Sequence, residues 1–132
     1  VMSATDLPFL DMVAASARAV AGQRVGMLAS PAVRLAQVFN DDFANCGAQP
    51  LWAIDDAPLL AQIRAVKAGA GGADIAQDLA REAHALLAQG ADVLLVGCSE
   101  LSLAVPHLPA DLPVRDSLDC LVQDIVRHAR PA

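Results

Sequence analysis

The chain has 132 residues, of which 55% are hydrophobic and 3% are aromatic, and its formal net charge is -6. This length suits one small domain with a buried core. An acidic chain without a basic patch is not expected to bind nucleic acid. No apolar run approaches the ~20 residues that span a bilayer, so we expect no membrane segment.

Cysteine usage bounds the compartment and the chemistry. The three cysteines, Cys46, Cys98 and Cys120, lack the spacing of a disulfide framework or of a zinc site. The histidines are scattered, so the sequence predicts no metal site. No secretory signal is visible in the first residues. Together these features predict a cytoplasmic protein.

The first half of the chain alternates strand and helix candidates. The expected elements are a short strand at residues 6–12, a helix at 13–20, a strand at 24–29, a helix from Ser30 to about Asn45, and a strand at 48–54. Ser30 followed by Pro31 is typical of a helix start, and Gly47 is typical of a helix end. Pro50 favours an edge position for the third strand.

The second half continues the alternation. The expected elements are a helix that begins near Pro58, a helix at 73–89, a buried strand at 93–97, a short strand at 112–115, and a helix at 118–128. The last helix is expected to bury an apolar stripe of Leu118, Leu121, Val122, Ile125 and Val126. This pattern predicts an α/β fold of three layers, with a mostly parallel sheet of about four strands and helices on both faces.

Three of the predicted strands end in small polar residues. Ser30 follows one strand, Cys98 and Ser99 follow another, and Asp116 with Ser117 follows the last. The carboxyl ends of parallel strands meet at one edge of the sheet, so these side chains are expected to converge on a small anionic ligand. Cys98 would lie beside the start of the segment that begins at Glu100, where free backbone N–H groups favour the thiolate. The alternatives are a packed core cysteine and serines that only cap helices.

The same residues resemble the aspartate/glutamate racemase family, which also contains hydantoin racemases, maleate isomerases and arylmalonate decarboxylases. The resemblance lies in four ordered segments: DLPFLDMVAASARAV at 6–20, RVGMLASPAV at 24–33, GCSEL at 97–101 and LPVRDSLDCL at 112–121. It implies a fold of two α/β lobes with the active site between them. It also implies racemisation without a cofactor, by two cysteines on opposite faces of the substrate α-carbon.

The resemblance assigns roles to particular residues. Cys98 would be one of the two acid/base groups, and Ser30 and Ser99 would bind the substrate carboxylate. The side chains that would orient these groups are Glu100, Asp116 and Ser117. The substrate would be an amino acid or a dicarboxylate.

The resemblance covers only part of the family pattern, and some residues that the family uses for catalysis are absent from this sequence. The matching segments correspond to the second lobe: an inter-lobe segment at 1–22, the lobe itself at 23–110, and a returning strand and helix at 111–132. The Cys-Asn-Thr motif of the first lobe is not in the sequence. Val33 stands where the family has a threonine. Cys46 and Cys120 are expected to be packing cysteines, so we expect little racemase activity from this chain alone.

Two other functions fit the same residues. Arylmalonate decarboxylases resemble this family and use a single cysteine to protonate an enolate, which suits a chain with one candidate catalytic cysteine. Alternatively, the chain is a binding or assembly remnant without catalysis. In that case the apolar face normally covered by the first lobe would pair with another copy, through residues 6–20 and the C-terminal helix, to give a homo-oligomer.

Overall fold

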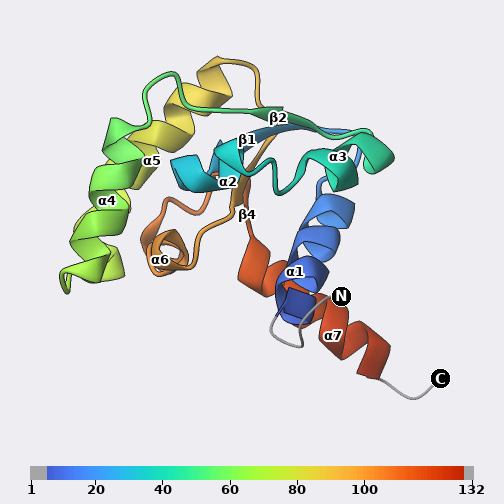
Figure 1. The fold of residues 1–132 in the computed structure, drawn as a ribbon. Coiled ribbons are helices and arrows are strands. Elements are labelled where there is room, and N and C mark those ends of the chain that lie inside the picture. Colours follow the sequence, from blue (N-terminus) through green and yellow to red (C-terminus); the bar gives the residue numbers. More distant parts are fainter. Residues whose placement is uncertain (1–5, 130–132) are drawn as a thin grey trace.

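The computed structural model describes residues 6–129, with side chains for 12–127, and has helices on both sides of a small sheet (Figure 1). The sheet contains four parallel strands in the order β2-β1-β3-β4. Their bounds are β1 Arg24–Leu28, β2 Gln49–Leu51, β3 Val93–Val96 and β4 Val114–Asp116. The predicted α/β class and parallel sheet are therefore confirmed.

Seven α-helices and one 3-10 helix are found within residues 6–129. Their bounds are α1 Asp6–Ala19, α2 Pro31–Leu35, α3 Asn40–Cys46, α4 Ala57–Lys67, α5 Gly72–Ala88, α6 Ser99–Ser102, the 3-10 helix η1 Val105–His107, and α7 Ser117–Ala129. Figure 1 shows α4 and α5 on one side of the sheet and α1 with α7 on the other. No helix among the described residues is long and apolar enough to cross a membrane.

The two-residue period of the strands divides the core into two clusters. On β3, Leu94 and Val96 pack with the apolar residues of α4 and α5. Val93 and Leu95 point to the other face and pack with residues of α1 and α3. Buried on both faces, β3 reads VLLV without polar residues, as expected for an inner parallel strand.

The edge position predicted from Pro50 is also confirmed, because β2 pairs only with β1. The strand is shorter than predicted. It ends at Leu51, and Ile54 is almost fully exposed beyond it. Proline has no backbone N–H to donate, so a strand that contains it forms fewer hydrogen bonds with its neighbour and is easily shortened.

Two predictions for the first half are wrong. Residues 6–12 belong to α1 and form no strand. Pro8 lies in the first turn of this helix, where a missing N–H costs nothing. The single helix predicted from Ser30 to Asn45 is two helices, α2 and α3. The break contains Gln37, whose φ of 55° is left-handed and ends α2.

The predicted buried stripe of α7 is wrong as well. Four of its apolar residues are substantially exposed: Leu118 at 41%, Val122 at 56%, Ile125 at 57% and Val126 at 47%. The helix packs against α1 by another face, on which Cys120 is buried. Periodicity correctly predicted an amphipathic helix, but within residues 6–129 no element covers its apolar face.

Candidate functional site

The carboxyl ends of three strands meet at one edge of the sheet. In the β1–β3 pair, Leu28 lies opposite Val96, and the Gly97 N–H donates to the Leu28 carbonyl at 3.0 Å. Ser30 and Cys98 each follow this paired position by two residues. In the β3–β4 pair, Val96 lies opposite Asp116. The structure therefore brings Ser30, Cys98 and Asp116 to the same edge, as the strand pattern predicted.

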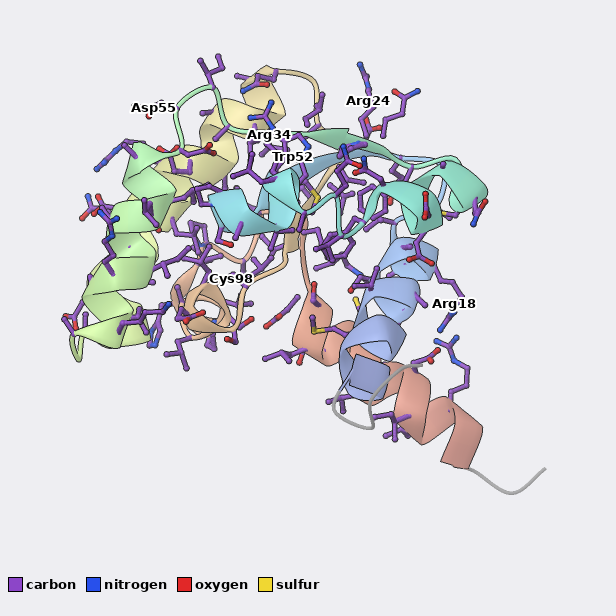
Figure 2. All side chains as sticks on the ribbon, viewed as in Figure 1. Arg18, Arg24, Arg34, Trp52, Asp55 and Cys98 are labelled. Atoms are coloured by element: carbon purple, nitrogen blue, oxygen red, sulfur yellow. The ribbon has the colours of Figure 1, made fainter. Side chains whose placement is uncertain are left out.

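Cys98 lies at the junction between β3 and the short helix α6. It is the residue before the first turn of α6, with extended backbone angles. Its side chain is half-buried and packs against the core cluster beneath α4 and α5. Figure 2 shows Cys98 beside α6, well away from Arg18 on α1. As a whole residue, Cys98 is therefore neither fully buried nor exposed.

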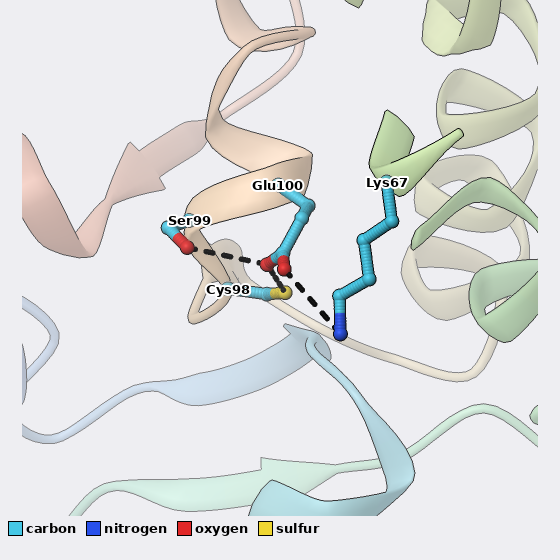
Figure 3. Close-up of polar contacts among 4 residues, drawn as sticks. All are labelled: Lys67, Cys98, Ser99 and Glu100. Carbon is cyan, nitrogen blue, oxygen red and sulfur yellow. Dashed lines mark hydrogen bonds and ion pairs between the residues drawn. The ribbon is translucent and has the colours of Figure 1, made fainter. Parts of the chain in front are cut away.

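Glu100 holds the Cys98 thiol from the same helix. The thiol donates to Glu100 Oε2 at 3.1 Å, and the Ser99 hydroxyl donates to the same oxygen at 3.2 Å. Lys67 Nζ, from the end of α4, lies 3.7 Å from Glu100 Oε1. Figure 3 shows all four side chains facing one another. The carboxylate thus gathers a thiol, a hydroxyl and an ammonium group at the strand ends.

The pKa of Cys98 is raised, which contradicts the expected thiolate. Burial is the largest cause, and the hydrogen bond to the Glu100 carboxylate is the second. The N–H groups of Leu101 and Glu100 lower the pKa, as a helix start should, but they are outweighed. The Cys98 thiol in turn lowers the pKa of Glu100. At neutral pH the pair is therefore a thiol beside a carboxylate.

Asp116 joins β4 to α6 and α7. Its Oδ1 accepts from the Ser102 hydroxyl at 2.8 Å and from the Leu118 N–H at 3.1 Å. Ser102 Oγ also lies 3.2 Å from the Cys98 carbonyl oxygen. Burial is the main reason that the pKa of Asp116 is raised. Ser102 therefore lies between this carboxyl and the backbone of Cys98, the residue directly before α6.

The three predicted serines differ in what they contact. Ser99 is exposed and bonded to Glu100. Ser30 is half-buried directly before α2, and its hydroxyl makes no capping hydrogen bond to that helix. The sequence suggested Ser30 as the cap of this helix, but its hydroxyl does not serve that purpose in the structure. Ser117 is buried, and its hydroxyl has no partner among the described residues.

Sequence reasoning missed Lys67 and Ser102. Lys67 is 33 residues from Glu100 by their sequence numbers, and the two meet only because α4 packs against α6. A basic residue in the last turn of a helix has an ordinary explanation there. Ser102 did carry a signal, since it lies one helical turn after Cys98, where side chains share a face.

The other two cysteines lie elsewhere. Cys46 ends α3, and its thiol donates to the Ala17 carbonyl oxygen at 3.3 Å, near the amino ends of the strands. Cys120 is buried on α7, and burial is the main cause of its raised pKa. Cys120 also lines a hollow of about 160 Å³ with Asp116, the last residue of β4. Among the described residues no group of three or more His, Cys, Asp or Glu side chains is placed to hold a metal ion.

Comparison with known proteins finds racemases, both among family models and among solved structures. The family model of Asp/Glu/hydantoin racemases matches residues 1–125. Among solved structures, aspartate racemase from Picrophilus torridus is similar, with a TM-score of 0.66 and 18% sequence identity over 91% of this chain. This chain spans 51% of the length of that protein. No curated protein matches the sequence.

Proposed function

This chain belongs to the Asp/Glu/hydantoin racemase family, and from that premise we propose that it is a racemase-type isomerase whose proton-transfer group is Cys98. The observation that carries the proposal is the position of the Cys98 thiol. It lies half-buried at the carboxyl end of an inner parallel strand, hydrogen-bonded to Glu100. Ligands of open α/β sheets bind at this end of the strands.

The proposed reaction moves a proton at the α-carbon of a small acid and needs no cofactor. The reactive form is the Cys98 thiolate, a minor species at neutral pH because burial and the hydrogen bond to Glu100 raise the pKa of the thiol. The thiolate takes the α-proton, so that the C–H bond breaks, an S–H bond forms, and the electron pair is delocalised into the substrate carboxylate. Returning a proton to the same carbon restores the acid. Inversion requires that this proton arrive from the opposite face.

The substrate carboxylate would lie between the ends of β1 and β3. The Ser30 hydroxyl is not used by α2, and the Ser99 hydroxyl is exposed beside Cys98. Lys67 adds a positive charge at the same edge. Hydroxyl donors and a nearby cation favour the negative charge that grows on the carboxylate as the proton leaves. Glu100 and Asp116 would orient Cys98, Asp116 by way of Ser102, and the buried Ser117 would support that end of β4.

The group on the opposite face is proposed to lie outside this chain. The chain spans about half the length of the structurally similar aspartate racemase. Of its other cysteines, Cys46 donates to the Ala17 carbonyl oxygen, and Cys120 lies on α7 and lines hollows at the α1–α7 contact and at the end of β4. We therefore expect one-sided chemistry from this chain, with slow exchange of the α-proton and no measurable inversion.

Deuterium wash-in at the α-carbon of aspartate and glutamate tests this. We expect slow incorporation with retained configuration, lost in Cys98→Ser and kept in the matched Cys46→Ser control. Exchange that survives in Cys98→Ser would remove this cysteine from the mechanism. Full inversion by the chain alone would contradict the proposal that the second group lies elsewhere.

A second candidate is a decarboxylase that uses one cysteine, and the state of the thiol favours it. A thiol kept protonated beside a carboxylate is suited to donate a proton to an enolate formed by loss of CO2. This reaction needs no second cysteine. Release of CO2 from substituted malonates, abolished in Cys98→Ser, would support the decarboxylase, and undiminished release in that variant would exclude Cys98.

We also propose that the chain forms a homo-oligomer. The support is the exposed apolar face of α7, which includes Val122 and Ile125. Light scattering across a range of concentrations tests it, and a strictly monomeric species at high concentration would contradict it. The cytoplasmic location expected from cysteine usage stays a prediction, and fractionation of the producing cells would test it.

A further inference from the structure

A groove separate from the Cys98 edge runs between α4 and α5. It has a volume of about 300 Å³, and Figure 1 shows the two helices side by side on one face of the sheet. Its apolar walls include Ala61 and Ala65 of α4 and Ile75 of α5. A smaller hollow of about 190 Å³ shares Pro58 and Glu82 with it and extends toward the strands.

Gln62 is the unexpected residue in this groove. It is 4% exposed, and neither its amide nitrogen nor its amide oxygen has a hydrogen-bond partner among the described residues. A buried amide without partners is costly and uncommon in native proteins. Because the residue lines the groove, a ligand there could accept from its N–H or donate to its oxygen.

The groove is also strongly acidic. Asp74, Asp78 and Glu82 follow one another at four-residue spacing on α5, and all three line it together with a single cation, Arg81. Four residues of helix rise by about 6 Å, so the three carboxylates form a row along one side. Figure 2 shows Asp55 beside the start of α4, where it lines the adjoining hollow.

The three carboxylates of this row differ in their hydrogen-bond and ion-pair partners. Asp74 Oδ2 accepts from the Gly71 N–H at 2.8 Å, which leaves its second oxygen open. Asp78 Oδ1 pairs with Arg81 at 3.0 Å. Within the described part of the chain, Glu82 makes no hydrogen bond or ion pair. Its pKa is raised by burial, with Asp55 and Asp78 adding to the shift and Arg81 opposing it. Glu82 is therefore a half-buried carboxylate between two others, offset in part by Arg81, whose guanidinium pairs with Asp78.

We propose that this groove binds a small aliphatic diamine. One ammonium group would pair with Glu82, the second with the open oxygen of Asp78 or Asp74 one or two helical turns away, and Gln62 Oε1 would accept from one of them. The carbon chain would lie on the apolar walls. A diamine whose nitrogens are about 6 Å apart matches one turn of the carboxylate row. A compact metal ion fits less well, since it would leave the apolar walls unused.

Titration calorimetry of the intact chain with putrescine, cadaverine, butylamine and Mg²⁺ tests the proposal. We expect saturable binding of the two diamines, at least tenfold weaker binding of butylamine, and no comparable binding of Mg²⁺. Glu82→Gln should weaken diamine binding at least tenfold. The matched control Asp111→Asn removes an equal charge from an exposed loop and should leave it unchanged.

Each contrary result is informative. No saturable binding of either diamine would overturn the proposal and leave Gln62 to be satisfied by water only. Equal weakening by Glu82→Gln and Asp111→Asn would reduce the effect to net charge, and Mg²⁺ bound as tightly as the diamines would also overturn it. Gln62→Leu should weaken binding without unfolding the chain, as checked by circular dichroism. If that variant does not fold, the Glu82→Gln result decides.

Discussion

Two amphipathic helices of this chain, α5 and α7, have similar patterns and different surroundings. On α5 the apolar residues Ile75, Leu79 and Leu86 are buried against the sheet. On α7 the corresponding residues, Val122 and Ile125 among them, are largely exposed. A period of 3.6 residues shows that a helix has an apolar face, but the rest of the fold determines whether that face is covered.

The largest expected effect is the loss of stability when a buried apolar side chain of α5 is shortened. Leu79 is fully buried between α5 and the sheet, and Leu79→Ala should lower the free energy of unfolding by about 2–5 kcal/mol. The matched variant Ile125→Ala removes an apolar side chain that is mostly exposed, so it should change stability by less than about 0.5 kcal/mol. Urea unfolding followed by circular dichroism measures both.

A loss above about 1 kcal/mol in Ile125→Ala, outside the usual range for an exposed site, would show that the α7 face is covered in solution. Repeating the measurement at several protein concentrations then separates self-association, which makes stability concentration-dependent, from packing within one chain.

A glycine at the start of α5 gives the next largest effect. A Cβ added to Gly72 would overlap the carbonyl group of Leu103, which lies in the backbone just after α6. Backbone cannot rotate away as a side chain can, so Gly72→Ala should destabilise the chain by about 1–3 kcal/mol. Gly71→Ala, whose Cβ would meet only Asp74 at an ordinary contact distance, should cost less than about 1 kcal/mol. Equal costs would mean that α5 does not dock as closely as described.

The comparison also shows what the sequence could and could not predict. Strand order along the chain, the edge position of β2 and the meeting of Ser30, Cys98 and Asp116 follow from local patterns and the parallel rule. The pairing of Lys67 with Glu100 depends on how α4 packs on α6, which no local pattern encodes. The thiolate prediction was wrong because it considered the helix start alone and ignored burial and the neighbouring carboxylate.

The thiols on the two sides of the molecule offer a third test. Burial raises the pKa of both Cys98 and Cys120, but only Cys98 also bonds to a carboxylate. Glu100→Gln removes that negative charge, so the pKa of Cys98 should fall and its alkylation by iodoacetamide near neutral pH should become several-fold faster. Cys120 should react as slowly as before, as peptide mass mapping can show.

The raised pKa of Cys98 also makes the stability of the folded chain depend on pH. The unfolded chain ionises this thiol at lower pH than the folded chain does, so stability is fully present below the ordinary thiol range and is lost as pH rises through the folded pKa. The loss should be smaller in Glu100→Gln than in the unchanged chain. An equal loss in both would show that Glu100 does not influence the thiol.

The smallest expected effect concerns the ion pair that joins α1 to α7. Arg18 Nη2 lies 2.9 Å from Asp124 Oδ2, and the arginine side chain is 55% exposed. Exposed pairs contribute little because solvent screens them, so Arg18→Ala should cost about 0.2–1 kcal/mol and less in high salt. Arg81→Ala, which removes the Asp78 pair on α5, is the matched control and should cost a similar amount.

A much larger loss in Arg18→Ala alone, insensitive to salt, would mean that α7 is held to the domain mainly by this contact. The rest of the contact between α1 and α7 would then hold the helix only weakly. In that case α5 and α7 would differ both in how far their apolar faces are covered and in how firmly each helix is attached to the domain.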